Sequence, residues 1–199
     1  MKLLFFDKKG LTLIELMIVL VLSLLLMSAV YMTFQVQRST ANVQHEVSSI
    51  QQDLRAVIDI MAWDIRHVGC DPTLSTTAGL FPGLTGPKKI AFSMDLNDDG
   101  STGGTDEVVT YSLNGTDLTR NGNVMAQNVT TLGLTFFDAD NNAITPTDSG
   151  GTLLTSDEAD DVRSVTIKIQ VQSNKKDPDT GEYIYRTMDR RIKLRNMGI

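Results

Sequence analysis

One acidic residue, Glu15, stands at the start of the longest apolar run in the sequence. Residues 16–37 contain no charged side chain, and a lone carboxylate beside such a run is costly in lipid unless it is paired. Thr12 and Glu15 also match a capping box, in which each side chain bonds the other residue's backbone N–H at a helix N-terminus. The sequence therefore offers two roles for Glu15, a local one in helix capping and a functional one in pairing with a cation.

A cut after Gly10 would supply that cation. Leu11 would become the N-terminal residue, and its amine would lie four residues before Glu15. In a bundle of parallel helices, the carboxylate of one subunit would meet the amine of its neighbour. Such a pair would neutralise two charges in an apolar setting and would fix the register between the helices.

An acidic stretch farther along the chain, residues 95–101, matches the D-x-N-x-D-G opening of a calcium loop. The predicted ligands are Asp95, Asn97, Asp99, the carbonyl of Ser101, and Asp106 at the twelfth position. The flanking residues 90–94 and 108–113 are typical of strands, so the prediction is an isolated loop rather than an EF-hand. A solvated acidic turn has the same composition, and both interpretations stay open. Ca²⁺ is the one cofactor that the sequence suggests.

Catalytic residue types are scarce in the chain. The sequence has two histidines and one cysteine, which excludes a histidine-rich centre, an internal disulfide and a multi-cysteine zinc site. His67 and Cys70 lie three residues apart, but no further partners are apparent, so a packed helix end is the favoured interpretation. The formal net charge of −6 argues against nucleic acid as a partner. We therefore predict a protein that is not an enzyme.

The apolar run is long enough to cross a membrane. Residues 16–34 would span about 28 Å as a helix. Lys8 and Lys9 precede it, and the positive-inside rule then places the rest of the chain on the far side of the membrane. A removable secretory signal and a plain single-pass anchor are the alternatives, although the run exceeds the usual apolar length of a signal peptide.

The remaining pattern predicts an α+β fold. No proline or glycine occurs between residues 11 and 68, and apolar residues recur there at steps of three and four, which indicates one long amphipathic helix. Strands are expected over residues 108–113, 117–120, 129–137, 165–171 and 186–195. The turn Asn114-Gly115 predicts a hairpin, and the acidic run 157–161 reads most simply as a solvated loop. An antiparallel sheet covered by the helix would bury the apolar stripe.

The sequence KKGLTLIE at residues 8–15, followed by the apolar run, resembles the class III signal of type IV prepilins and pseudopilins. The resemblance implies that prepilin peptidase cuts the Gly10–Leu11 bond and methylates Leu11. It also implies that Glu15 guides assembly and that the chain has the pilin fold.

Two further stretches narrow the resemblance. Residues 51–72 and 190–196 are similar to the PilW-type minor pilins. This implies a minor subunit of a type IV pilus that primes assembly or lies near the tip. The implied partners are prepilin peptidase, other major and minor pilins, the inner-membrane assembly platform, membrane lipid and a tip adhesin. A type II secretion minor pseudopilin and a membrane-anchored, calcium-dependent binding module are the alternatives.

These interpretations divide the chain into four parts. They are a leader peptide (residues 1–10), a transmembrane and assembly half of the helix (11–37), an amphipathic half of the helix (38–70) and a globular β-sheet domain (71–199). The expected location is the inner membrane, with the N-terminus in the cytoplasm and the C-terminal domain in the periplasm, and then the pilus at the cell surface.

Overall fold

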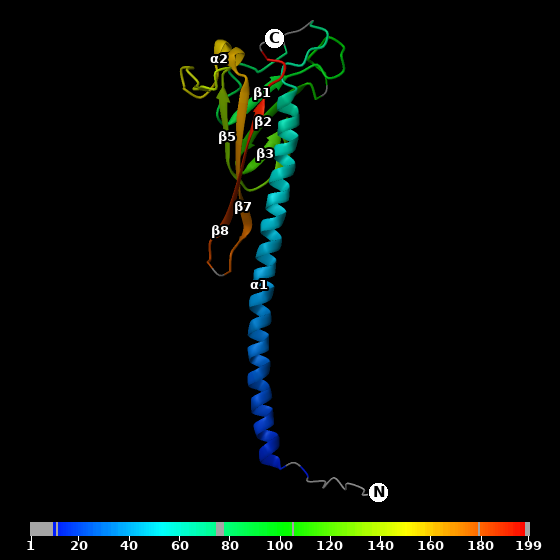
Figure 1. Ribbon diagram of the computed structural model, residues 1–199, viewed down its shortest axis with the longest axis vertical. Helices are drawn as coiled ribbons and strands as arrows, with labels where there is room; N and C mark the ends of the chain where they lie inside the picture. Colours follow the sequence, from blue (N-terminus) through cyan, green and yellow to red (C-terminus); the bar gives the residue numbers. More distant parts are fainter. Residues whose placement is uncertain (1–9, 11, 75–77, 105, 179, 198–199) are drawn as a thin grey trace. The chain divides into compact units, whose positions relative to one another are not determined.

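The computed structural model describes residues 10, 12–74, 78–104, 106–178 and 180–197 (Figure 1). The chain divides into two compact units, residues 1–45 and 46–199. The helices and strands follow in the order α1 (Leu13–Arg66), β1 (Lys89–Ser93), β2 (Val108–Asn114), β3 (Asp117–Arg120), β4 (Asn123–Ala126), β5 (Val129–Phe137), β6 (Ala143–Ile144), α2 (Ser156–Asp161), β7 (Ser164–Lys176) and β8 (Tyr183–Lys193).

The helix α1 contains 54 residues, and its span agrees with the region that lacks proline and glycine. It ends shortly before Gly69, which adopts a left-handed φ of 74° and donates its N–H to the carbonyl of Ser93. The apolar stripe is buried from Ile50 onward, whereas Val43 and Val47 are only half-buried. The long helix predicted from periodicity is therefore confirmed.

The described part of the second unit, residues 46–199, is called the globular unit below. Its strands form two four-stranded antiparallel sheets rather than one continuous sheet. The first has the order β1-β2-β3-β4 and the second the order β6-β5-β7-β8. Figure 1 shows both sheets beside the C-terminal part of α1. The predicted α+β architecture, a long N-terminal helix on antiparallel strands, is confirmed.

The hydrophobic core lies between the helix and the sheets. Helix residues with nearly no exposure, such as Met61 and Ile65, share one cluster with Phe92, Ile167 and Ile169 from the strands. Burying side chains of this size stabilises the fold by about 1.5 to 3 kcal/mol each. In β7 the inward residues alternate with polar ones, as expected for a sheet with one covered face.

Two local predictions need correction. The hairpin between β2 and β3 forms, but Asn114 pairs with Asp117, so the connecting residues are Gly115 and Thr116. The acidic run 157–161 is not a loop but belongs to the short helix α2. Its N-cap, Thr155, forms a complete capping box with Glu158, and Ala159 anchors the helix in the core.

Candidate functional site

The start of α1 shows the predicted capping box. The carboxylate of Glu15 accepts hydrogen bonds from the backbone N–H and the hydroxyl of Thr12, both at 2.9 Å, and the N–H of Glu15 donates to Thr12 Oγ1 at 3.3 Å. Gly10 is exposed. Leu11, the expected N-methylation site, lies outside the described residues, as do leader residues 1–9. The local role of Glu15 is thus visible in the structure, and its pairing with a neighbouring amine stays a prediction.

The N-terminal unit exposes its apolar side chains. An 18-residue stretch of α1 near the N-terminus has a mean hydropathy of 2.7, long and apolar enough to span a membrane, and none of it is buried within the protein. Large residues such as Leu22, Leu26 and Phe34 are each more than half exposed. A surface of this kind needs lipid or other apolar helices around it.

Polar side chains within this apolar helix satisfy themselves locally. The hydroxyls of Ser23, Ser28 and Thr33 donate to backbone carbonyls three or four residues earlier, at 2.8 to 3.0 Å. Such bonds remove the cost of placing a free hydroxyl donor in lipid. The helix is therefore compatible with a membrane in composition and in hydrogen bonding.

The predicted calcium loop is closed by its own hydrogen bonds. Asp95 is buried, and its two oxygens accept from the N–H groups of Asp98 and Gly100 at 2.8 and 3.0 Å. Asp99 accepts from the Asn97 amide at 3.0 Å and from the N–H of Ser101 at 2.8 Å. The hydroxyl of Ser101 accepts from a backbone N–H at 3.1 Å, while its carbonyl is the predicted ligand.

The three carboxylates that the structure brings together differ from the three predicted carboxylate ligands at one position. Oxygens of Asp95, Asp99 and Glu107 lie within 4.8 Å of one another. Glu107 is buried and accepts from the N–H of Gly104 at 2.6 Å. Among the described residues, Asp106 is not part of this group but is exposed. Calcium binding itself stays a prediction.

Asp106 instead belongs to a polar network that is centred on the buried Asp64. Arg120 on β3 donates to Asp106 and to Asp64 on α1, each at 2.8 Å. Tyr111 on β2 donates its hydroxyl to the same Asp64 carboxylate at 2.5 Å. Burial, followed by this hydrogen bond, raises the pKa of Tyr111, and the carboxylate partners raise the pKa of Arg120 despite its burial. The network joins the helix to the first sheet, and its members lie 47 and 56 residues apart, too far for sequence spacing to predict the contacts.

His67 and Cys70 show no sign of a reactive pair. One ring nitrogen of His67 lies 2.8 Å from the carbonyl oxygen of Trp63, and the two rings are in contact, with centroids 4.3 Å apart and planes tilted by 39°. Burial, with nearby aspartates, raises the pKa of the Cys70 thiol, so it holds less of the nucleophilic thiolate. Within the described part of the chain, neither residue belongs to a group that could hold a metal.

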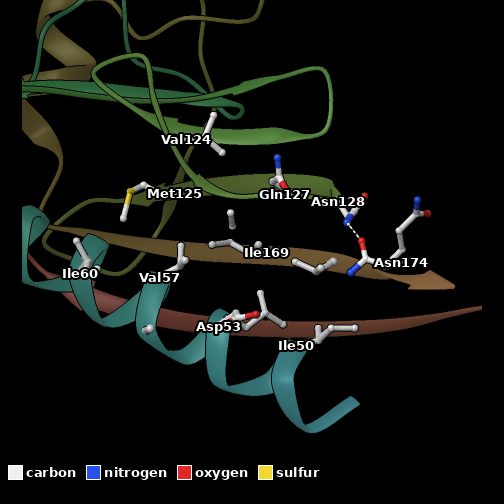
Figure 2. Close-up of a pocket in the computed structure, with 15 residues that line it drawn as sticks. Ile50, Asp53, Val57, Ile60, Val124, Met125, Gln127, Asn128, Ile169 and Asn174 are labelled. Carbon is white, nitrogen blue, oxygen red and sulfur yellow. Dashed lines mark hydrogen bonds between the residues drawn. The ribbon is translucent and has the colours of Figure 1, made fainter. Parts of the chain in front are cut away.

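A groove of about 560 Å³ lies in the globular unit between α1, the β4–β5 segment and β7. Figure 2 shows Ile50, Val57 and Ile60 of the helix along one wall, with Val124 and Met125 opposite. Figure 2 also shows the hydrogen bond that closes one end, in which the Asn128 amide donates to Asn174 at 2.6 Å. The lining of the groove combines apolar side chains with side-chain amides and the carboxylate of Asp53.

Comparison with known protein families gave two matches. Residues 43–194 match the family described as prepilin peptidase-dependent protein B, and residues 6–31 match the prokaryotic N-terminal methylation motif. No curated protein matches the chain. Neither description names PilW-type minor pilins, so that narrower resemblance stays a prediction.

Proposed function

Because the chain belongs to the prepilin peptidase-dependent protein B family, we propose that it is a minor pilin that enters a type IV pilus. In this role it primes assembly or lies near the tip of the filament. The family consists of pilin-like structural proteins, so the chain is a substrate of prepilin peptidase and not itself an enzyme.

Processing is proposed to occur at the Gly10–Leu11 bond, with methylation of the new N-terminal amine on Leu11. The methylation motif covers both residues, and Gly10 is exposed in the structure. A side chain at Gly10 would meet no atom within 4 Å. The glycine is therefore not required for packing, which supports a role in recognition by the peptidase.

The observation that carries the proposal is a single carboxylate in the first turn of α1, directly before the exposed apolar residues 16–37, which carry no charge. Among the described residues, Glu15 accepts from Thr12 alone, three residues earlier. Carboxylate oxygens have several lone pairs, so capacity remains for an ammonium donor. The N-terminal amine of a neighbouring subunit would supply that donor and neutralise the charge in lipid.

The proposed location follows from the same segment. A hydrophobic helix after a methylation motif marks a membrane-anchored, pilin-like protein. We place the globular unit in the periplasm before assembly, since Lys8 and Lys9 precede the span. Other pilins, the assembly platform and a tip adhesin are the proposed partners.

The test compares two charge-removing variants in native cells. Glu15→Gln keeps an oxygen that can cap the helix, and Glu15→Ala removes it. Both should be processed and methylated at Leu11, as seen by mass spectrometry, yet be absent from sheared surface filaments. Asp53→Ala, which removes an exposed carboxylate farther along the same helix, should be incorporated normally.

The proposal fails if Glu15→Gln enters filaments as well as the unaltered chain does, or if residues 1–10 remain attached in filament material. Gly10→Val should abolish processing without unfolding the protein. Recovery of the chain only with a secretion pseudopilus would instead identify it as a minor pseudopilin.

A further inference from the structure

A second cavity, of about 520 Å³, lies at one end of the second sheet. It is lined by the turn after β5, the beginning of β7 and the end of β8. Three of its lining residues are basic, Arg163, Arg191 and Lys193, and one is acidic, Asp138. This gathering of positive charge stands out in a chain whose net charge is −6.

The Arg191 guanidinium is held in place by two kinds of contact. It stacks on the ring of Phe137 with its central carbon 3.9 Å from the ring centroid. Its Nε and Nη2 donate to the hydroxyl of Ser164 at 3.0 and 2.8 Å, and Ser164 is only 7% exposed. No partner for Nη1 is found among the described residues. The contacts therefore fix the plane of the group and leave hydrogen-bond donors available.

The other two cations also have no acidic partner among the residues that the structure describes. Arg163 donates from Nη1 to the backbone carbonyls of Asp160 and Val162, which position it without neutralising it. In the described part of the chain, none of the three lining cations lies within 4.0 Å of a carboxylate oxygen. Positive charges placed this close repel one another, and an anion between them would relieve that cost.

Asp138 does not serve as that anion. Its two oxygens accept from the side chain and the backbone N–H of Asn142, at 3.0 and 2.8 Å. The same hydrogen bonds lower the pKa of Asp138, so its charge stays fixed within its own turn. The cavity thus keeps an excess of positive charge after its own acidic residue is counted.

We propose that this cavity binds side-chain carboxylates from an acidic segment of a partner protein. A planar guanidinium with fixed orientation matches a carboxylate through paired N–H donors, and Arg163 and Lys193 add charge around it. The adjacent helix α2 carries Asp157, Glu158, Asp160 and Asp161. Its negative field disfavours a long polyanion such as nucleic acid, whereas a short acidic segment needs only the cavity.

The test uses the full-length chain, ¹⁵N-labelled and held in detergent micelles. The probe is a peptide of four aspartates with both ends blocked, and the uncharged control is the corresponding tetra-asparagine peptide. The aspartate peptide should shift the Arg191 Nε signal and the backbone amides of Arg163 and Lys193 in a saturable manner. The asparagine peptide should not do so.

Two matched variants test whether the aspartate peptide binds at Arg191. Arg191→Gln should weaken binding of the aspartate peptide about tenfold, since a charge-assisted pair contributes at least about 1.4 kcal/mol. Lys168→Gln, which removes another exposed cation from the same face of the second sheet, should change the affinity less than about twofold.

Three results would overturn the proposal: no saturable shift with the aspartate peptide, equal weakening by both variants, or tighter binding of inorganic phosphate than of the peptide. Phe137→Leu keeps every charge and removes the stacking surface, so it should weaken binding while leaving the circular dichroism spectrum unchanged. Binding here does not require filament entry, so a failed titration is distinct from a failed incorporation assay.

Discussion

Replacing Arg120 by methionine should destabilise the globular unit by about 3 kcal/mol. The Asp64 side chain is 3% exposed, and one of its oxygens accepts from Arg120 Nε at 2.8 Å and from the Tyr111 hydroxyl at 2.5 Å. Methionine retains much of the aliphatic length of arginine but no charge. The variant would leave the Asp64 carboxylate buried with a single donor, and that uncompensated charge is the source of the loss.

The magnitude follows from the exposure of the two partners. Breaking a buried ion pair by removing one side costs about 3 to 5 kcal/mol. The Arg120 side chain is 23% exposed, and its second bond, to Asp106, lies at the surface. Water can therefore reach the vacated position, which places the expected loss at the lower end of that range.

Urea unfolding of the full-length chain in detergent measures this loss. The fluorescence of Trp63, the single tryptophan, reports on the part of α1 that packs in the globular unit. The midpoint should fall while the slope stays constant. Arg190→Met is the matched control, since Arg190 pairs with Asp59 at the surface, where the two side chains are 38% and 58% exposed. It should cost less than about 1 kcal/mol.

A triple variant separates charge burial from packing. Asp64→Leu, Tyr111→Phe and Arg120→Met together remove every polar member of the buried contact, so no buried group lacks a partner. This variant should be more stable than Arg120→Met alone. The reasoning is refuted if Arg120→Met costs no more than Arg190→Met, or if the triple variant is the least stable of the set.

Three further outcomes are expected. Because burial raises the pKa of Tyr111 from 10.0, the folded state keeps a proton that the unfolded chain loses; stability should fall above about pH 10 by about 1.4 kcal/mol per pH unit. Urea titrations at a series of pH values above about 10 measure this dependence of stability on pH, and it should be absent in Tyr111→Phe. Gly86→Ala should lower the urea midpoint by about 2 kcal/mol or more, since its Cβ would lie 2.0 Å from a backbone carbonyl oxygen. Gly103→Ala, whose Cβ would have its nearest neighbour at 3.5 Å, should be nearly neutral. If the acidic loop binds calcium as predicted, calorimetry should show that Glu107→Gln weakens binding more than Asp106→Asn, and the opposite order would favour the ligand set that contains Asp106.

Features that depend on neighbouring residues were predictable from the sequence. The helix α1 follows from an uninterrupted run without proline or glycine, because its hydrogen bonds link residues four apart. The capping box of Thr12 and Glu15 formed as expected for the same reason. The capping box at Thr155 and Glu158 has the same spacing, so the signal for α2 was present in the sequence and was outweighed by the acidic composition of the run.

The choice between Asp106 and Glu107 could not be made from spacing alone. The two residues are adjacent in the turn just before β2, where Asp106 adopts a left-handed φ of 68°, so the alternation of side chains along a strand does not set their directions. Which one turns inward depends on the pairing of β2 with β3, where Tyr111 lies opposite Arg120. That register brings the Arg120 guanidinium to Asp106 and leaves the buried Glu107 with Asp95 and Asp99.

The processing motif, the acid before the apolar run and the alternation of the main strands could be recognised from the amino-acid order alone, since each depends on residues a few positions apart. Which distant polar groups meet became apparent from the packed fold. Asp64 bonds residues 47 and 56 positions away, and the basic cavity joins the ends of β7 and β8. Such contacts depend on how helix and sheets pack, because burial forces each polar group to take the partner that the packed backbone brings within reach.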